Sequence, residues 1–270
     1  MMRCIAAGES INTPAGVRND ASPAVSVISG DYSGMNEAIK GLQTEYVVFL
    51  EKGASLCDNA LSRLLKSVRG VGMAFCGYES PSEESPETVR RVLSSPDMAC
   101  RLFFRLHDES MVSNKLFRTS IIKKHGLFFE PSFKSECSCA FLASYLMYCK
   151  NARFIPERLV RMSDDEGGGF EETAESLKGF SYMRKLFKKK AAFSDALYYC
   201  GEYMSDVIFS LYSEMVNDGE ENEALYRNSV FREFARKLPL IVEKPNDKES
   251  LYYYKAIVRY GFTGRVDYEI

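Results

Sequence analysis

Residues 45–56 read EYVVFLEKGASL, and this stretch decides the fold. The run 46–50 is apolar, of strand length, and rich in aromatic and β-branched residues. It stops abruptly at Glu51, Lys52 and Gly53, which is the pattern of a buried parallel strand ending in a polar turn. Ligands of open α/β sheets bind beyond the carboxyl ends of the strands. The Glu51 carboxylate is therefore a site candidate, although a glutamate that opens an ordinary surface loop has the same pattern.

Composition sets limits on the rest of the chain. With 270 residues, 46% hydrophobic and 27% charged, the chain has room for one large domain, or one domain and a helical appendage. The formal charge of −2 gives no indication of a nucleic-acid partner. No apolar run approaches the roughly 18 residues of a membrane helix, and the first ten residues lack the features of a signal peptide. We expect a cytoplasmic protein whose scattered cysteines are reduced thiols.

The segments around this stretch alternate between strand and helix patterns. We expect strands at 24–29 and 71–78 and helices at 31–40 and 59–68. Strand, helix and strand with short polar connections indicate a parallel sheet with right-handed crossovers. The candidate helix caps are Ser33 for the first helix and Asp58 or Asn59 for the second.

Residues 30–56 resemble a block of family-2 glycosyltransferases of the GT-A fold. That block has a Gly-rich turn, an Asn on a short helix, a Gly-Glu/Asp-Tyr strand, and an acidic Asp-x-Asp-like motif. The spacing from Asn36 to Glu51 agrees with it without a gap. The matching positions are Gly30, Tyr32, Met35, Asn36, Ile39, Glu45, Tyr46, Phe49 and Leu50.

Residues 111–162 resemble a second block of the same family, in the same order along the chain. It comprises an Asn-Lys-Leu-Tyr/Phe-Arg segment, a Gly-x-x-Phe turn, a Glu-Asp motif on a helix, and a closing strand. The matching positions are Asn114, Lys115, Leu116, Phe117, Arg118, Gly126, Phe129, Glu136, Phe141, Pro156 and Leu159. The resemblance implies an α/β, GT-A-like (Rossmann-like), mostly parallel sheet with flanking helices.

The resemblance also implies roles for particular residues. A family member binds a nucleotide sugar, holds Mg²⁺ or Mn²⁺ near its diphosphate, and uses a carboxylate to deprotonate the acceptor hydroxyl. On this basis Glu51 is the predicted metal ligand and Glu136 the predicted catalytic base, with Lys115 on the acceptor side. The predicted donor-binding residues are Gly30, Asn36, Glu51 and Lys52.

Three positions depart from the family pattern. Ala7 stands where the family has a nucleotide-contacting Asp, Gly53 and Ala54 replace metal-binding positions, and Cys137 replaces the usual base. Glu136 precedes that base position by one residue, which on a helix turns a side chain by about 100°. The family's first strand and helix have no counterpart, so we expect an N-terminally truncated domain, and a truncated reading frame is an open question. We infer that metal-dependent chemistry is impaired or lost.

The predicted organisation is a GT-A-like domain at residues 1–165 and an α-helical region at residues 170–270. The polar insertion 79–96, with a short helix expected near 87–93, is either a lid facing the acceptor or a plain connection. The acidic, Gly-rich residues 164–169 indicate a hinge. Helices are expected at 170–216 with a break near 191–194, at 221–237 and at 248–260.

Two classes of function remain open. The first is a glycosyltransferase that acts on a surface-polysaccharide or lipid-linked acceptor. The second is a catalytically inactive GT-A-like module that binds a partner transferase or a glycan. The run RKLFKKK at 184–190 is either a basic helix that rests on the inner face of an anionic membrane or an ordinary solvated face.

Overall fold

The structure is a computed structural model that describes residues 24–79, 89–103, 110–162, 169–218 and 228–266, with the backbone of 5–6 and 17–18. The chain divides into two compact units. The first comprises Met1–Pro131 and Ser138–Glu166, and the second comprises Ser132–Cys137 and Gly167–Ile270. The predicted turn at 8–16, Ala7, and most of the predicted hinge lie outside the described residues.

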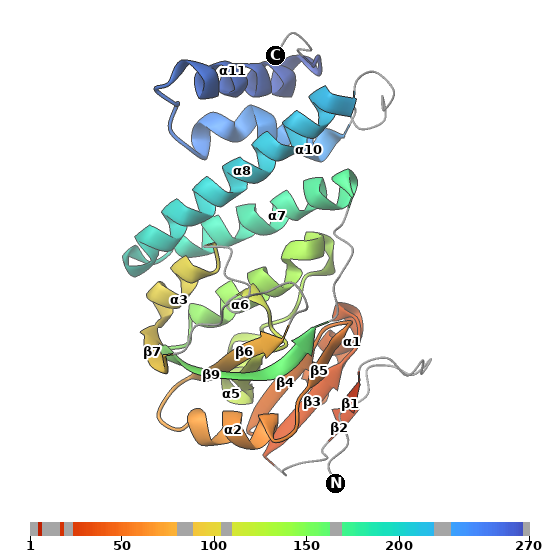
Figure 1. Cartoon of the computed structure of the whole chain (residues 1–270), viewed down its shortest axis with the longest axis vertical. Helices are drawn as coiled ribbons and strands as arrows, with labels where there is room; N and C mark the ends of the chain where they lie inside the picture. The colour runs from red at the N-terminus through yellow and green to blue at the C-terminus, as the bar shows by residue number, and fades with distance from the viewer. Residues whose placement is uncertain are drawn as a thin grey trace. The chain divides into compact units, whose positions relative to one another are not determined.

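The described strands of the first unit form one mixed sheet (Figure 1), in the order β1-β5-β9-β6-β8-β4-β3-β2, with β7 beside β9. The pairs β3–β4 and β6–β9 are parallel, and the other pairs are antiparallel. The strands are β1 Ile5–Ala6, β2 Val17–Arg18, β3 Val25–Ser29, β4 Tyr46–Leu50, β5 Ala54–Leu56, β6 Met73–Glu79, β7 Arg91–Ser94, β8 Lys115–Arg118 and β9 Asn151–Met162.

The parallel pair β3–β4 fixes where a site can form. All five residues of β4 are buried, as an apolar run of this kind requires. Val25 pairs with Tyr46 and Ser29 with Leu50, so the two strands end side by side. Their carboxyl ends therefore meet at one edge of the sheet, where Gly30 follows β3 and Glu51 follows β4.

Helices flank this sheet. Aromatic packing ties α6 to the centre of the sheet, because the Phe141 ring lies 5.5 Å from Phe49 and 5.7 Å from Phe117, centroid to centroid. The predicted α/β class with flanking helices is confirmed. The elements are α1 Tyr32–Gly41, α2 Ala60–Ser67, α3 Ser95–Arg101, α5 Thr119–His125 and α6 Cys137–Leu146. The short helix η1 Pro131–Glu136 belongs mostly to the second unit.

One predicted helix cap is wrong, and another is correct in position only. Asp31, not Ser33, caps α1, and its Oδ1 accepts a hydrogen bond of 2.7 Å from the Gly34 N–H. A carboxylate there satisfies a free N–H and also complements the helix dipole. Asn59 does stand at the N-cap of α2, but it adopts the left-handed conformation (φ 65°) and its side chain makes no capping bond.

The helix predicted near 87–93 is also wrong. Residues 91–94 form β7, which pairs antiparallel with β9 from Arg91–Phe154 to Ser94–Asn151. The helix begins later, at α3, because the Ser94 side chain accepts a hydrogen bond from the Asp97 N–H and a proline stands in the first turn. Residues 80–88 of the same insertion lie outside the described residues.

The second unit is helical, as predicted. In it α7 packs against α8, and α10 against α11. Gly261 permits the second pairing, because a Cβ there would lie 2.3 Å from the Arg236 backbone nitrogen. No described helix is long and apolar enough to cross a membrane. The elements are α7 Phe170–Phe187, η2 Ala191–Phe193, α8 Ser194–Asp218, α10 Ser229–Lys237, η4 Leu238–Leu240 and α11 Lys248–Thr263.

Candidate functional site at the carboxyl ends of β3 and β4

Three hydroxyl groups hold the carboxylate of Glu51 directly beyond β4. Tyr32 Oη donates to Glu51 Oε1 at 3.0 Å, and Ser138 Oγ donates to the same oxygen at 2.5 Å. Ser113 Oγ donates to Oε2 at 2.9 Å and accepts from the Glu51 N–H at 3.0 Å. The carboxylate thus joins the start of α1, the segment before β8, and the first turn of α6. Hydrogen bonds to a charged acceptor are each worth about 1.5–3 kcal/mol.

The cluster has fewer hydroxyl hydrogens than hydrogen-bond contacts. Tyr32 Oη also lies 3.1 Å from Ser138 Oγ, so the two hydroxyls and Glu51 Oε1 form a triangle. Each hydroxyl has one hydrogen, and three contacts cannot all be served by two hydrogens. The hydroxyls can therefore redirect a hydrogen between each other and the carboxylate, or toward a bound ligand.

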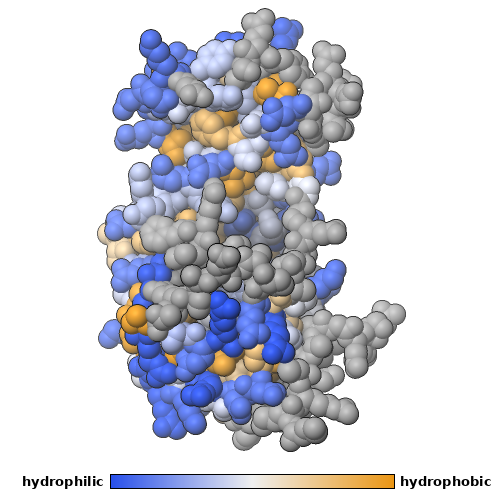
Figure 2. Space-filling view, viewed as in Figure 1, coloured by the Kyte–Doolittle hydropathy of each residue, from blue (hydrophilic) through white to orange (hydrophobic). Residues whose placement is uncertain are grey.

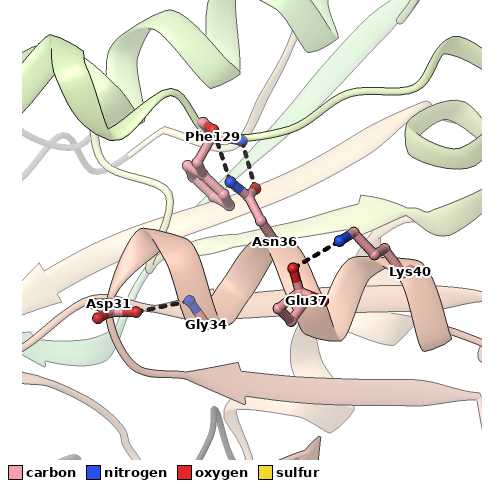
Figure 3. Close-up of polar contacts among 6 residues, drawn as sticks. All are labelled: Asp31, Gly34, Asn36, Glu37, Lys40 and Phe129. Carbon is pink, nitrogen blue, oxygen red and sulfur yellow. Dashed lines mark hydrogen bonds and ion pairs between the residues drawn. The ribbon is translucent and has the colours of Figure 1, made fainter.

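Asn36 positions the aromatic wall of this cluster (Figure 3). Its Nδ2 donates to the Phe129 carbonyl at 2.8 Å, and its Oδ1 accepts from the Phe129 N–H at 2.8 Å. The Phe129 ring stacks on Tyr32 at 5.2 Å between centroids, and Tyr32 in turn contacts Glu51. The amide of Asn36 is thus engaged with backbone, and it acts on the site through Phe129 and Tyr32.

The backbone around the site depends on glycine. Gly30, between β3 and α1, has φ 142°, and Gly53, after β4, has φ 82°, values that side-chain-bearing residues rarely adopt. Between Gly53 and the strand stands Lys52, whose side chain is exposed. Glu51 is held by hydrogen bonds, whereas the exposed ammonium of Lys52 can turn toward an anionic ligand.

The residues present do not form a dedicated divalent-cation site. Mg²⁺ and Mn²⁺ sites need several oxygen ligands, commonly one or two carboxylates together with substrate phosphates. Three of the lone pairs of Glu51 accept hydroxyl hydrogens, Gly53 has no side chain, and Ala54 is buried in β5. Among the described residues, no three His, Cys, Asp or Glu side chains come together in a metal-binding arrangement.

Lys115 is fully buried in the first unit. Its ammonium donates to the Met111 carbonyl and, at 2.7 Å, to Asn114 Oδ1, and it lies 5.4 Å from the Phe75 ring centroid. A buried lysine of this kind is held by its hydrogen bonds and its cation–π contact. These are the contacts of a residue that braces the segment carrying Ser113. The acceptor-side role assigned to Lys115 gains no support from them.

Glu136 ends η1, in the second unit. A Cβ on Gly179 of α7 would lie 2.7 Å from Glu136 Cβ, so α7 and the end of η1 approach each other closely. Phe133 of the same segment packs on Tyr182 of α7. Burial raises the pKa of the Glu136 carboxyl from 4.5 to about 7. A carboxylate with such a pKa accepts protons near neutral pH, which is the property of a general base.

Sequence patterns did not identify three groups of this site. Ser113 and Ser138 are buried serines without a distinguishing motif, and Tyr32 was noted as a matching position without a role. Their only signal was proximity to residues already singled out, since Ser113 precedes Asn114 and Ser138 follows Glu136 by two positions. Of the predicted donor-binding residues, three lie at the carboxyl ends of β3 and β4, namely Gly30, Glu51 and Lys52. Asn36 instead binds the Phe129 backbone.

By sequence, no family model and no curated protein matches the chain. Solved structures do. TarS 1–349 of S. aureus in complex with UDP-GlcNAc matches with a TM-score of 0.54 at 11% identity, over 87% of this chain and 73% of that chain. The same protein in complex with UDP gives a TM-score of 0.53 at 10% identity.

The chain has a GT-A-like glycosyltransferase fold. The likeness extends over 84% of this chain but only 42% of the longer TarS structure, at a TM-score of 0.53. A mannosyltransferase from Pyrobaculum calidifontis, in complex with GDP-Man and Mn²⁺, is a looser match, with a TM-score of 0.43 and 10% identity. Identities this low establish the fold and leave substrate and activity to the residues of the site.

Proposed function

We propose that this chain is a glycosyltransferase-like protein that binds a nucleotide sugar at the carboxyl ends of β3 and β4. The observation that carries the proposal is the fixed carboxylate of Glu51, which lies directly beyond β4 in a fold shared with a UDP-GlcNAc complex. Ligands of open α/β sheets bind at this edge. A carboxylate has about four lone-pair sites, so Glu51, which accepts from three hydroxyls, can accept one further hydrogen bond from a sugar or ribose hydroxyl without reorganisation.

In this proposal the ammonium of Lys52 binds the negatively charged diphosphate of the donor. Its exposed ammonium follows Glu51 directly, and Gly53 lets the backbone turn away from the ligand with φ 82°. A lysine is a common partner of phosphate groups as a point charge. Because the residues do not fit a dedicated divalent-cation site, donor binding is expected to depend little on Mg²⁺ or Mn²⁺.

Glu136 is the proposed proton acceptor. In the transfer, the acceptor oxygen bonds to the anomeric carbon while the bond from that carbon to the diphosphate oxygen breaks, and the acceptor proton passes to a base. A pKa of about 7 gives Glu136 a substantial carboxylate fraction at neutral pH. The proposed acceptor is a surface polysaccharide or a lipid-linked glycan.

A second function is favoured by the incomplete set of metal ligands. A fold that keeps the sheet edge and loses the metal ligands can serve as an inactive module that binds a partner transferase or a glycan. In such a module the hydroxyl cluster around Glu51 is a brace between α1, β8 and α6. The two functions differ in one measurable property, which is turnover of a bound donor.

Calorimetric titration with UDP-GlcNAc and GDP-mannose, each with Mn²⁺ or with EDTA, tests the proposal. We expect saturable binding of one donor in both conditions and roughly tenfold weaker binding by Lys52→Ala, since a charge-assisted hydrogen bond is lost. Lys66→Ala is the matched control, an exposed lysine in the last turn of α2. No binding of either donor refutes the donor site, and binding that requires Mn²⁺ refutes the metal argument.

Release of free nucleotide then separates the two functions. Hydrolysis or transfer that consumes the bound donor, and that falls in Glu136→Gln, supports the enzyme. A bound donor that persists unchanged, or a stable protein complex without donor binding, supports the module.

A further inference from the structure

The end of the α7–α8 helical hairpin carries a dense positive charge. Lys185 lies in the last turn of α7, Lys188 is its C-cap, and Lys189 follows, all with exposed side chains. Within the described residues, none of these three lysines has an ion-pair partner. Residues 184–190 hold five cations, and the next twelve residues hold two acids, in a chain whose net charge is −2. This positive charge is therefore concentrated in one segment of a chain that is slightly negative overall.

Large apolar side chains are exposed beside these lysines. Leu240 of η4 is 79% exposed and Tyr198 of α8 is 61% exposed. Tyr199 is exposed as well and packs against Tyr198 edge-on. Figure 2 shows apolar surface interspersed with hydrophilic surface over the helices of the second unit.

Hydrogen bonds of Arg184 connect the charged and apolar parts. Its two guanidinium nitrogens donate to the carbonyls of Leu240 at 3.2 Å and Ile241 at 3.1 Å. A Cβ on Gly201 of α8 would lie 2.3 Å from the same guanidinium, so α8 passes directly beside it. Arg184 therefore holds Leu240 against the end of α7.

Helix geometry completes the surface. Lys188 follows Arg184 by four positions and Tyr198 precedes Gly201 by three, and residues at these spacings share a helix face. Lys188 therefore lies on the helix face of Arg184, Tyr198 lies on the face of Gly201, and the Leu240 carbonyl is bonded to Arg184. We call the exposed side chains of this surface the hairpin patch, which consists of Lys185, Lys188, Lys189, Tyr198, Tyr199 and Leu240.

We propose that the hairpin patch binds the surface of an anionic lipid bilayer. Lysines lower their free energy near anionic headgroups, while tyrosine and leucine enter the boundary between headgroups and acyl chains. Charge complementarity selects this occupant. The patch presents three exposed lysines and two exposed tyrosines, and a basic and aromatic surface of this kind suits an anionic bilayer.

The proposal goes beyond donor binding and does not depend on it. Co-sedimentation of the full chain with vesicles tests it directly. We expect binding to phosphatidylglycerol-rich vesicles and none to pure phosphatidylcholine vesicles, with loss of binding as salt increases. Replacing Lys185, Lys188 and Lys189 with glutamine lowers the partition coefficient roughly 100-fold, because each lysine near an anionic surface contributes a several-fold gain.

Two controls separate the patch from general effects. The triple variant Lys66→Gln, Lys124→Gln, Lys244→Gln removes the same charge from exposed positions outside the patch and keeps wild-type vesicle binding. Tyr198→Ser with Leu240→Ser weakens vesicle binding at low salt, because it removes the side chains that enter the boundary of the bilayer. The proposal is overturned if phosphatidylglycerol vesicles fail to bind at low salt, if both triple variants bind alike, or if neutral vesicles bind equally. Binding to a nucleic acid with no binding to vesicles overturns it as well.

Discussion

Glu136→Gln is predicted to make the protein more stable above pH 7 and to leave its stability unchanged at low pH. Burial raises the pKa of this carboxyl from 4.5 to about 7 in the folded chain, because the charged form loses its hydration. Below pH 4.5 the carboxyl is neutral in the folded and unfolded states, so it contributes no difference. As the pH rises from 4.5 to 7, the unfolded chain releases the proton first, and the folded state loses stability.

The size of this effect follows from the two pKa values. Moving the pKa from 4.5 to about 7 corresponds to a loss of about 3 kcal/mol at most in the free energy of unfolding, complete above pH 7. Glutamine has nearly the same shape and does not titrate. The difference in unfolding free energy between the variant and the wild type is therefore expected to rise by up to about 3 kcal/mol across this interval.

Urea unfolding of both proteins at closely spaced pH values measures this difference, and other titrating groups cancel in it. Glu202→Gln is the control, since Glu202 lies exposed on α8 of the same unit. The control measures what the same change from carboxyl to amide does at an exposed position. A flat difference for Glu136→Gln refutes the reasoning, because it means that Glu136 is hydrated like a surface carboxyl and lacks the pKa of a neutral-pH base.

Further substitutions test the packing around the site. Glu51→Ala leaves three hydroxyls without their acceptor and is expected to cost about 2–4 kcal/mol in urea unfolding, with Glu51→Gln costing less because it keeps one acceptor oxygen. Asn36→Ala removes both bonds to the Phe129 backbone and is expected to cost about 2–3 kcal/mol; an unchanged midpoint contradicts the bracing role. Gly179→Ala places a Cβ 2.7 Å from Glu136 Cβ and is expected to cost about 1–3 kcal/mol in thermal unfolding, whereas Gly41→Ala, with open space around it, is expected to cost nothing.

The sequence predicts the parts of this fold that depend on continuous patterns. The apolar run of β4 is buried along its whole length, and the helical spacing of the C-terminal region corresponds to α7, α8, α10 and α11. Such patterns predict structure reliably because the burial of many side chains outweighs the conformational preference of any single residue. They identify elements and the order of elements.

Features that depend on a partner distant in the chain are not predictable in this way. Residues 91–94 form a strand because they pair with the backbone of β9, and their own sequence does not predict that pairing. Lys115 is buried because its ammonium donates hydrogen bonds to Met111 and Asn114 and lies over the Phe75 ring. From sequence alone, a single lysine is expected to be exposed. The hydroxyls of Ser113 and Ser138 reach Glu51 across 62 and 87 positions of sequence.

The central claim is that a nucleotide sugar binds beyond the carboxyl ends of β3 and β4, against the fixed carboxylate of Glu51. A crystal structure of the chain soaked with UDP-GlcNAc, without added divalent cation, tests it most directly. The account predicts electron density for the ligand at this edge, with Glu51 and Lys52 within hydrogen-bonding distance. Density at another place on the chain, or an empty edge at saturating ligand, contradicts the account.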